Sequence, residues 1–208
     1  MVSRRRVVGC DDGLSWWQRM VNRPATNSPR NALLWGVAWL IVATILGWHL
    51  HLVPMSLVDY DIYGYLPLLW HLAINVVVWI TSASLFYLAA VIRNREVQIV
   101  ELYGRMLFAH WPITLLMLPR LGVDSIEYAL LVNDLPAAFE KSAVSATLFA
   151  LLVIVVIVWY LHWSYQAFSK ASQRRGGLTI AMYVCVLYLA NKLTILVLNS
   201  VYSGLMNL

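Results

Sequence analysis

The chain has little charge. Of its 208 residues, only 12% are Asp, Glu, Lys or Arg, about half of the ~25% that is typical of soluble domains. Its hydrophobic share of 61% lies well above the ~45–50% of such domains. A soluble fold of this size would have to expose much of that apolar surplus, whereas a lipid bilayer accommodates it. The composition therefore predicts an integral membrane protein.

Cysteine and catalytic motifs are also scarce. Cys10 and Cys185 are the two cysteines, and their separation gives neither a metal-binding spacing nor a disulfide framework. The sequence has no glycine-rich phosphate loop, nucleophile elbow or HExxH motif, and no carboxylate pair inside an apolar segment. We therefore expect no enzyme and no catalytic, cofactor or metal site. The net charge of +5 does not indicate a nucleic-acid partner, because the basic residues are spread in short clusters between apolar runs.

Five apolar segments predict an all-α fold, a polytopic bundle of five transmembrane helices in residues 32–208. Four of them exceed the ~20 residues that a membrane-crossing helix needs. The third holds only about fourteen residues between Arg105 and Arg120 and contains Pro112 and Pro119, which favour kinks. It is either a short span with snorkelling arginines or a re-entrant segment. The predicted spans are about 32–52, 66–92, 106–120, 143–168 and 178–205.

The distribution of basic residues favours the five-span interpretation. With five spans, twelve basic residues lie on one side of the membrane and two on the other, whereas a re-entrant third segment gives nine against five. Cytoplasmic loops carry the excess of Lys and Arg, so the N-terminus is predicted inside and the C-terminus outside, in the cell inner membrane. The side with the excess holds residues Arg4, Arg5, Arg6, Arg19, Arg23, Arg30, Arg93, Arg95, Arg105, Lys170, Arg174 and Arg175.

The loops carry two further expectations. Residues 1–31 form a cytoplasmic segment in which 14–21, with Trp16, Trp17 and Arg19, suit a short helix lying in the headgroup region; an unstructured tail is the alternative. Residues 125–132 are predicted to form a short helix on the outer surface.

Lys192 is the least expected residue, because it falls inside the fifth span beside Asn191. A lysine at the bilayer centre costs ~2.5–3.5 kcal/mol on insertion scales and usually faces a partner inside the bundle. Asn75 and His110 are the candidate partners, and the four residues form the candidate polar interior. The alternatives are a polar pocket or ion path, a purely structural pair, or a lysine that snorkels outward.

Five potential metal-ligand side chains follow one another near the outer ends of the first two spans. Imidazoles and carboxylates are metal-ligand types, but neighbouring histidines two residues apart point to different sides of a helix. Ordinary interfacial side chains are therefore the favoured interpretation of His49, His51, Asp59, Asp61 and His71.

Two stretches resemble the bacterial branch of the Ypt-interacting-protein (Yip) family. One is Leu-Trp-Gly at 34–36 through Gly-Trp-His at 47–49, and the other is Glu-Leu-Tyr-Gly-Arg at 101–105 followed by Phe-Ala-His-Trp-Pro at 108–112. The resemblance implies five spans with the N-terminus inside. The short loops, the lack of a catalytic set and the basic cytoplasmic face favour a non-enzymatic protein that organises the membrane or partner proteins. Its partners would be the lipid bilayer, anionic lipids attracted to the basic side and other membrane proteins. The alternative is a small transporter or channel component with a polar interior around Lys192.

Overall fold

The computed structural model describes residues 28–63, 65–173 and 176–206. Most of the expected cytoplasmic segment, including the predicted helix at 14–21, lies outside the described residues.

Four long helices dominate the structure: α3 (Pro29–Leu50), α4 (Leu68–Arg93), α8 (Ala143–Ala171) and α9 (Gly177–Met206). Each is long and apolar enough to cross a membrane, which confirms the first, second, fourth and fifth predicted segments as helices. Local sequence fixes where two of them begin. The Ser28 and Ser142 hydroxyls accept hydrogen bonds from backbone N–H groups of the first turns of α3 and α8, groups that the helix itself leaves unpaired.

The third segment differs from the single helix predicted at 106–120. It consists of α5 (Ile99–Ala109) followed directly by a 3₁₀ helix, η1 (Trp111–Leu121). The break falls at His110, just before Pro112, whose missing N–H cannot continue the α-helical pattern. Since a 3₁₀ helix rises ~2.0 Å per residue and an α-helix ~1.5 Å, the two pieces together extend over about 38 Å. The segment is thus longer than the sequence indicates, although it is not one of the four long helices.

A small β-hairpin makes the all-α prediction incomplete. Strands β1 (Leu52–Pro54) and β2 (Tyr60–Ile62) pair antiparallel, with Val53 opposite Asp61. The hairpin follows His51, which ends α3 in the left-handed conformation with φ 57°, so the chain turns sharply out of the helix. Two short helices, α6 (Ser125–Asn133) and α7 (Leu135–Lys141), complete this end, and α6 confirms the helix predicted at 125–132.

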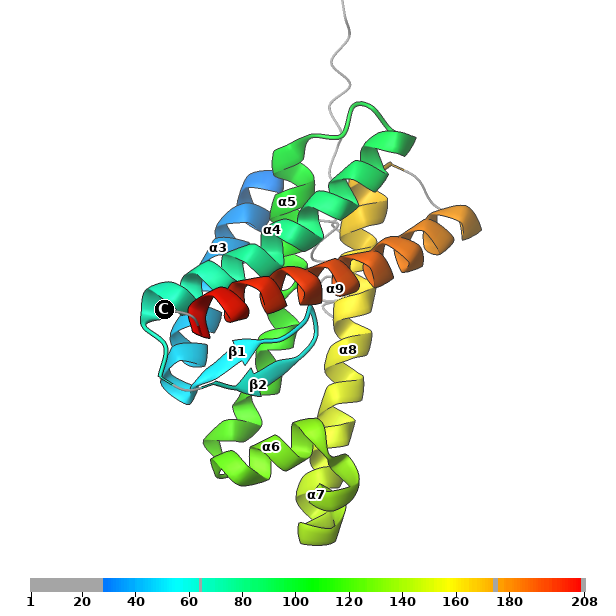
Figure 1. Ribbon diagram of the computed structural model, residues 1–208. Helices are drawn as coiled ribbons and strands as arrows, with labels where there is room; N and C mark the ends of the chain where they lie inside the picture. Colours follow the sequence, from blue (N-terminus) through cyan, green and yellow to red (C-terminus); the bar gives the residue numbers. More distant parts are fainter. Residues whose placement is uncertain (1–27, 64, 174–175, 207–208) are drawn as a thin grey trace, which may run out of the picture.

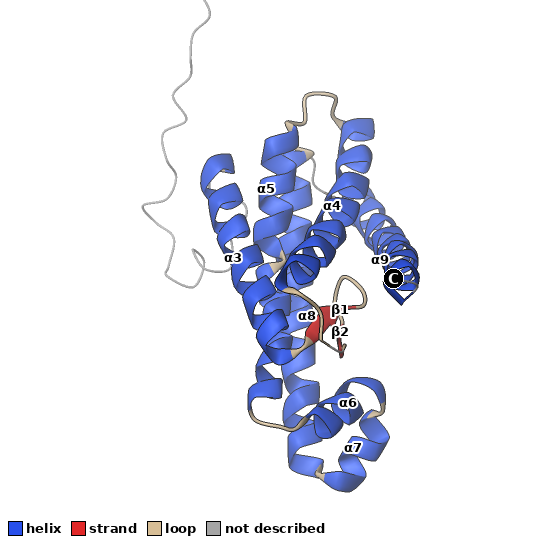
Figure 2. Cartoon of the chain, turned by 60° about the vertical axis from the view of Figure 1, so that its left-hand side comes forward, coloured by secondary structure: helices blue, strands red, loops and turns tan. Residues whose placement is uncertain are grey.

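The elements form a bundle with two distinct ends (Figures 1 and 2). α3, α5 with η1, and α8 run alongside one another, whereas α4 and α9 pack together and α9 crosses α8 obliquely. The starts of α3 and α5 and the ends of α4 and α8 gather at one end. The hairpin, α6 and α7 occupy the opposite end. α3, α4, α5 with η1, and α8 therefore alternate in direction along the chain.

Two glycines set the close approach of α3 and α5. A Cβ atom at Gly36 would lie 2.8 Å from Leu107 Cγ and 2.9 Å from Phe108 N, and one at Gly104 would lie 3.0 Å from Leu33 Cβ. Small residues at such crossings let helix backbones pack tightly in membranes. The two stretches that carry the family resemblance thus face each other in the fold.

Candidate functional site

Two of the four candidate interior residues line one small pocket inside the bundle. Asn75 on α4 and His110, between α5 and η1, line a volume of about 20 Å³ together with Tyr60 and Thr114. Asn75 is 8% exposed and donates its side-chain N–H to the His71 carbonyl at 2.9 Å, while the His110 ring packs edge-on against Tyr160. A cavity of this size holds about one water molecule. The structure therefore brings Asn75 and His110 together around space for a single water, not around a channel.

Asn191 and Lys192 lie elsewhere, on α9. The side-chain oxygen of Asn191, Oδ1, accepts a hydrogen bond from the Leu57 backbone N–H at 3.1 Å. Asn191 thus ties the loop of the β-hairpin to the last helix. Lys192 is exposed, and its Nζ lies 5.8 Å from the centre of the Tyr188 ring. This arrangement is a cation–π contact one helical turn apart. Lys192 thus lies on the outer face of α9, away from the cavity.

Among the residues that the structure describes, no group of three or more His, Cys, Asp or Glu side chains is placed to hold an ion. His51 instead packs against Tyr65 with ring centroids 4.6 Å apart, and Asp61 accepts hydrogen bonds from Ile62 N and Asn133 Nδ2.

An aromatic cluster that was not predicted from the sequence joins three of the long segments. Trp111 at the start of η1 stacks on Trp39 of α3 at 4.9 Å between ring centroids. On its other side, Trp111 meets Trp159 and Trp163 of α8 at 5.1 and 5.9 Å. Such pairs contribute ~0.5–1.5 kcal/mol each beyond the area they bury. The cluster therefore holds the break at His110 between α3 and α8.

The end where α5 starts and α8 ends is basic on its surface, and we call it the basic end. Arg30, Arg95 and Lys170 are all exposed there. Glu101 is an acid of this end, but it forms an ion pair at 3.1 Å with Arg105, which is only 3% exposed. Glu96 is a second, exposed acid. The unshared surface charge at this end is therefore positive.

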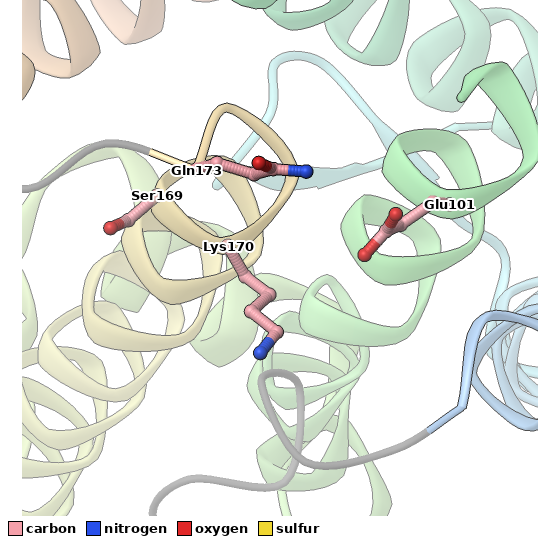
Figure 3. A pocket seen from close by; sticks show the side chains of 4 residues that line it. All are labelled: Glu101, Ser169, Lys170 and Gln173. Carbon is pink, nitrogen blue, oxygen red and sulfur yellow. The ribbon is translucent and has the colours of Figure 1, made fainter. Parts of the chain in front are cut away.

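A polar pocket of about 440 Å³ lies at the basic end between α5 and α8 (Figure 3). It is lined by Glu101 from α5, by Ser169 and Lys170 from the last turn of α8, and by Gln173 in the turn that follows. Gln173 extends toward Glu101 on the α5 side, whereas Lys170 extends in a different direction, downward in the view. Because Arg105 already pairs with Glu101, the ammonium and amide groups of the α8 side are available to an anion.

The opposite end is acidic, and we call it the acidic end. Its two basic side chains have local partners: Arg120 donates to the Val123 carbonyl at 2.7 Å and to Ser125, and Lys141 lies 3.9 Å from Glu127. Four aspartates belong to this end and take part in none of the ion pairs found within the described ranges. They are Asp59, Asp61, Asp124 and Asp134.

Two of these aspartates have shifted acidities. Partial burial, followed by the nearby Asp61 carboxylate, raises the pKa of Asp59 above its usual 3.8. Asp124 begins α6 by accepting a hydrogen bond from Glu127 N at 2.7 Å, and this bond to the charged form lowers the pKa of Asp124.

A second and more apolar groove, the outer groove, lies at the acidic end. It has a volume of about 400 Å³. The hairpin, η1, α6, α7 and α8 all contribute to its walls, which consist mainly of Leu, Val, Ile and Phe side chains. Asp59 is the charged residue of its lining, and Tyr60 and Tyr128 add hydroxyl-bearing rings. Sequence reasoning missed this groove because its walls come from five separate elements.

These features describe a mostly helical protein with four long apolar helices that could cross a membrane, the architecture of a multi-pass membrane protein. No family model matches the chain, and no curated protein or solved structure matches it. The resemblance to the Yip family gains no support from these comparisons and stays a prediction.

Proposed function

We propose that the chain is an inner-membrane protein with five spans, its N-terminus inside and its C-terminus outside, that organises membrane lipids or partner proteins without catalysing a reaction. α5 and η1 would form the third span, since their combined length of about 38 Å exceeds the ~30 Å hydrocarbon core. Their direction, opposite to α4 and α8, supports a crossing rather than a re-entrant path. A role like that of the Yip family is compatible with this proposal.

The observation that carries the proposal is the separation of charge along the bundle. Among the described residues, the exposed basic side chains of Arg30, Arg95 and Lys170 lie at one end, and four aspartates that belong to no ion pair lie at the other, where Arg120 and Lys141 have local partners. Basic residues concentrate on the cytoplasmic side of membrane proteins, where anionic lipid attracts them by ~1 kcal/mol per residue. The polar pocket beside Lys170 then lies at the level of the inner headgroups, where its ammonium and amide groups suit a lipid phosphate.

Cysteine labelling tests the orientation. In a variant with Cys10 and Cys185 replaced by Ser, one new cysteine is placed at Glu140, at the acidic end, or at Gln173, at the basic end; both positions are exposed. We expect a membrane-impermeant maleimide to label Glu140→Cys in intact spheroplasts and Gln173→Cys only after permeabilisation. Labelling of both from outside would contradict the five-span topology.

Lipid retention tests the role of the basic end. Native mass spectrometry of the full chain in mild detergent would measure bound phosphatidylglycerol in the wild type and in Lys170→Gln. Loss of ~1 kcal/mol corresponds to about fivefold weaker retention. Lys141→Gln is the matched control, because Lys141 is an exposed lysine at the opposite end. Equal losses in both variants would refute a specific anionic-lipid contact at the basic end.

The alternative, a small transporter or channel component with a polar interior around Lys192, has less support. Lys192 is exposed on α9, and the cavity beside Asn75 and His110 holds about 20 Å³. A transport role would require flux through reconstituted vesicles that falls in His110→Phe.

A further inference from the structure

The outer groove differs from a packed interior in that it opens onto the lipid-facing side of α8. Phe149, Ala150, Val153 and Ile154 form its α8 wall. Ile154 is 60% exposed, so the apolar lining continues onto the outer surface of the helix. An apolar pocket continuous with a lipid-facing surface is open to the hydrocarbon chains around it.

The groove lies near the outer boundary of the hydrocarbon core. The 29 residues of α8 extend about 43 Å at ~1.5 Å per residue, which is about 13 Å more than the ~30 Å core. If this excess is shared between the two ends, the core begins about four residues after Ala143. The α8 wall at 149–154 then lies within the outermost ~10 Å of the hydrocarbon, close to the outer headgroups.

The polar part of the groove is negative. Asp59 is part of the groove lining, and Asp61 is close enough to raise the pKa of Asp59. Neither carboxylate belongs to an ion pair among the described residues. The Tyr128 hydroxyl already donates to the Leu116 carbonyl at 3.1 Å. The charged group of the lining is therefore a carboxylate, which only accepts hydrogen bonds and is complementary to a cation that donates them.

We propose that the outer groove binds one phospholipid whose head carries a primary amine, with an acyl chain lying between α6 and α8 and the ammonium beside Asp59. The inference rests on the proposed insertion of the chain into the membrane. An anionic headgroup at this position would be repelled by Asp59 and Asp61. A quaternary amine would lack the N–H groups from which the carboxylate can accept hydrogen bonds.

Native mass spectrometry of the full chain tests the proposal with three dioleoyl lipids offered together: phosphatidylethanolamine, phosphatidylcholine and phosphatidylglycerol. We expect phosphatidylethanolamine to be retained two- to fivefold more than phosphatidylcholine, about the value of an exposed ion pair. Asp59→Asn should remove this preference while binding continues. Ala150→Phe, which fills the groove from its α8 wall, should remove most of the retained phosphatidylethanolamine.

The matched control is Leu151→Phe, which makes a similar change at an exposed neighbour on α8 outside the groove lining. It should retain lipid like the wild type. Equal retention of the three lipids by the wild type, or unchanged retention in both Asp59→Asn and Ala150→Phe, would overturn the proposal. If Ala150→Phe fails to fold, Asp59→Asn alone decides. Lys170→Gln tests the retention of phosphatidylglycerol at the basic end. A failure of the proposed function is therefore distinguishable from a failure of this inference.

Discussion

The crossing of α3 and α5 allows us to predict both the sign and the size of the change in stability that a substitution there causes. Gly36→Ala places a Cβ atom 2.8 Å from Leu107 Cγ and 2.9 Å from Phe108 N, whereas carbon atoms pack comfortably at ~3.5–4.0 Å. The second contact is to backbone, so no side-chain rotation relieves it. Overpacking of this kind costs ~1–3 kcal/mol, and the better helix propensity of alanine returns ~0.5–1 kcal/mol. We expect a net loss of about 1–2 kcal/mol.

Thermal unfolding in mild detergent, followed by size-exclusion fluorescence, measures this loss. At ~2–4 °C per kcal/mol for a chain of this size, Gly36→Ala should lower Tm by several degrees. Gly204→Ala is the matched control on α9, because a Cβ there meets no atom within 4 Å, and it should leave Tm unchanged or raise it. A Tm for Gly36→Ala equal to or above that of the wild type would refute the tight crossing.

Three further predictions concern polar groups. Glu101→Gln leaves the buried Arg105 without its carboxylate partner at 3.1 Å. Because Glu101 is partly exposed, we expect a loss of about 1–3 kcal/mol in the same unfolding assay, below the ~3–5 kcal/mol of a fully buried pair. Unchanged stability would mean that the ion pair has no structural role. Asn191→Leu removes the acceptor of the buried Leu57 N–H, which should cost ~1–3 kcal/mol, whereas Asn191→Asp, which keeps an acceptor oxygen, should cost less. The pKa of Asp59 is raised in the fold, so ionisation of this carboxyl weakens the folded state as pH rises through that pKa. Asp59→Asn should therefore be more stable than the wild type at pH 7, and this difference in stability should vanish toward pH 3.8. A difference that grows on acidification would contradict the prediction.

The third span shows what hydropathy can and cannot predict. The apolar run of this segment begins after Arg105, so the predicted span starts at residue 106. In the structure, Arg105 lies within α5 and pairs with Glu101 one turn earlier, so the helix extends back to Ile99. An i,i+4 ion pair of this kind is visible in the sequence, but its burial depends on how α5 packs against α3 and α8. The four long helices needed no such information, because length and apolar content define them.

The position of Lys192 follows from the periodicity of α9. The buried side chains of α9 include Tyr183, Ala190, Thr194 and Leu198, a stripe at intervals of seven and four residues. Such spacing marks one face of a helix, and Lys192 lies two residues from two of its members, about 200° away around the axis. Once this buried face of α9 is known, helical periodicity accounts for the outward position of Lys192. The outer groove had no comparable signal, because no single segment defines it.

The contacts of α9 with the hairpin have a consequence for how the protein is assembled. Asn191 accepts from Leu57 N across 134 residues of sequence, and Tyr202 donates to the Pro54 carbonyl across 148. At ~5–20 residues per second of synthesis, α9 leaves the ribosome on the order of 10 s after the hairpin does. During that interval Leu57 N and the Pro54 carbonyl lack these partners, so the hairpin is completed only when the last helix inserts. A nascent chain stopped before α9 would present this loop, still open, to the insertion machinery.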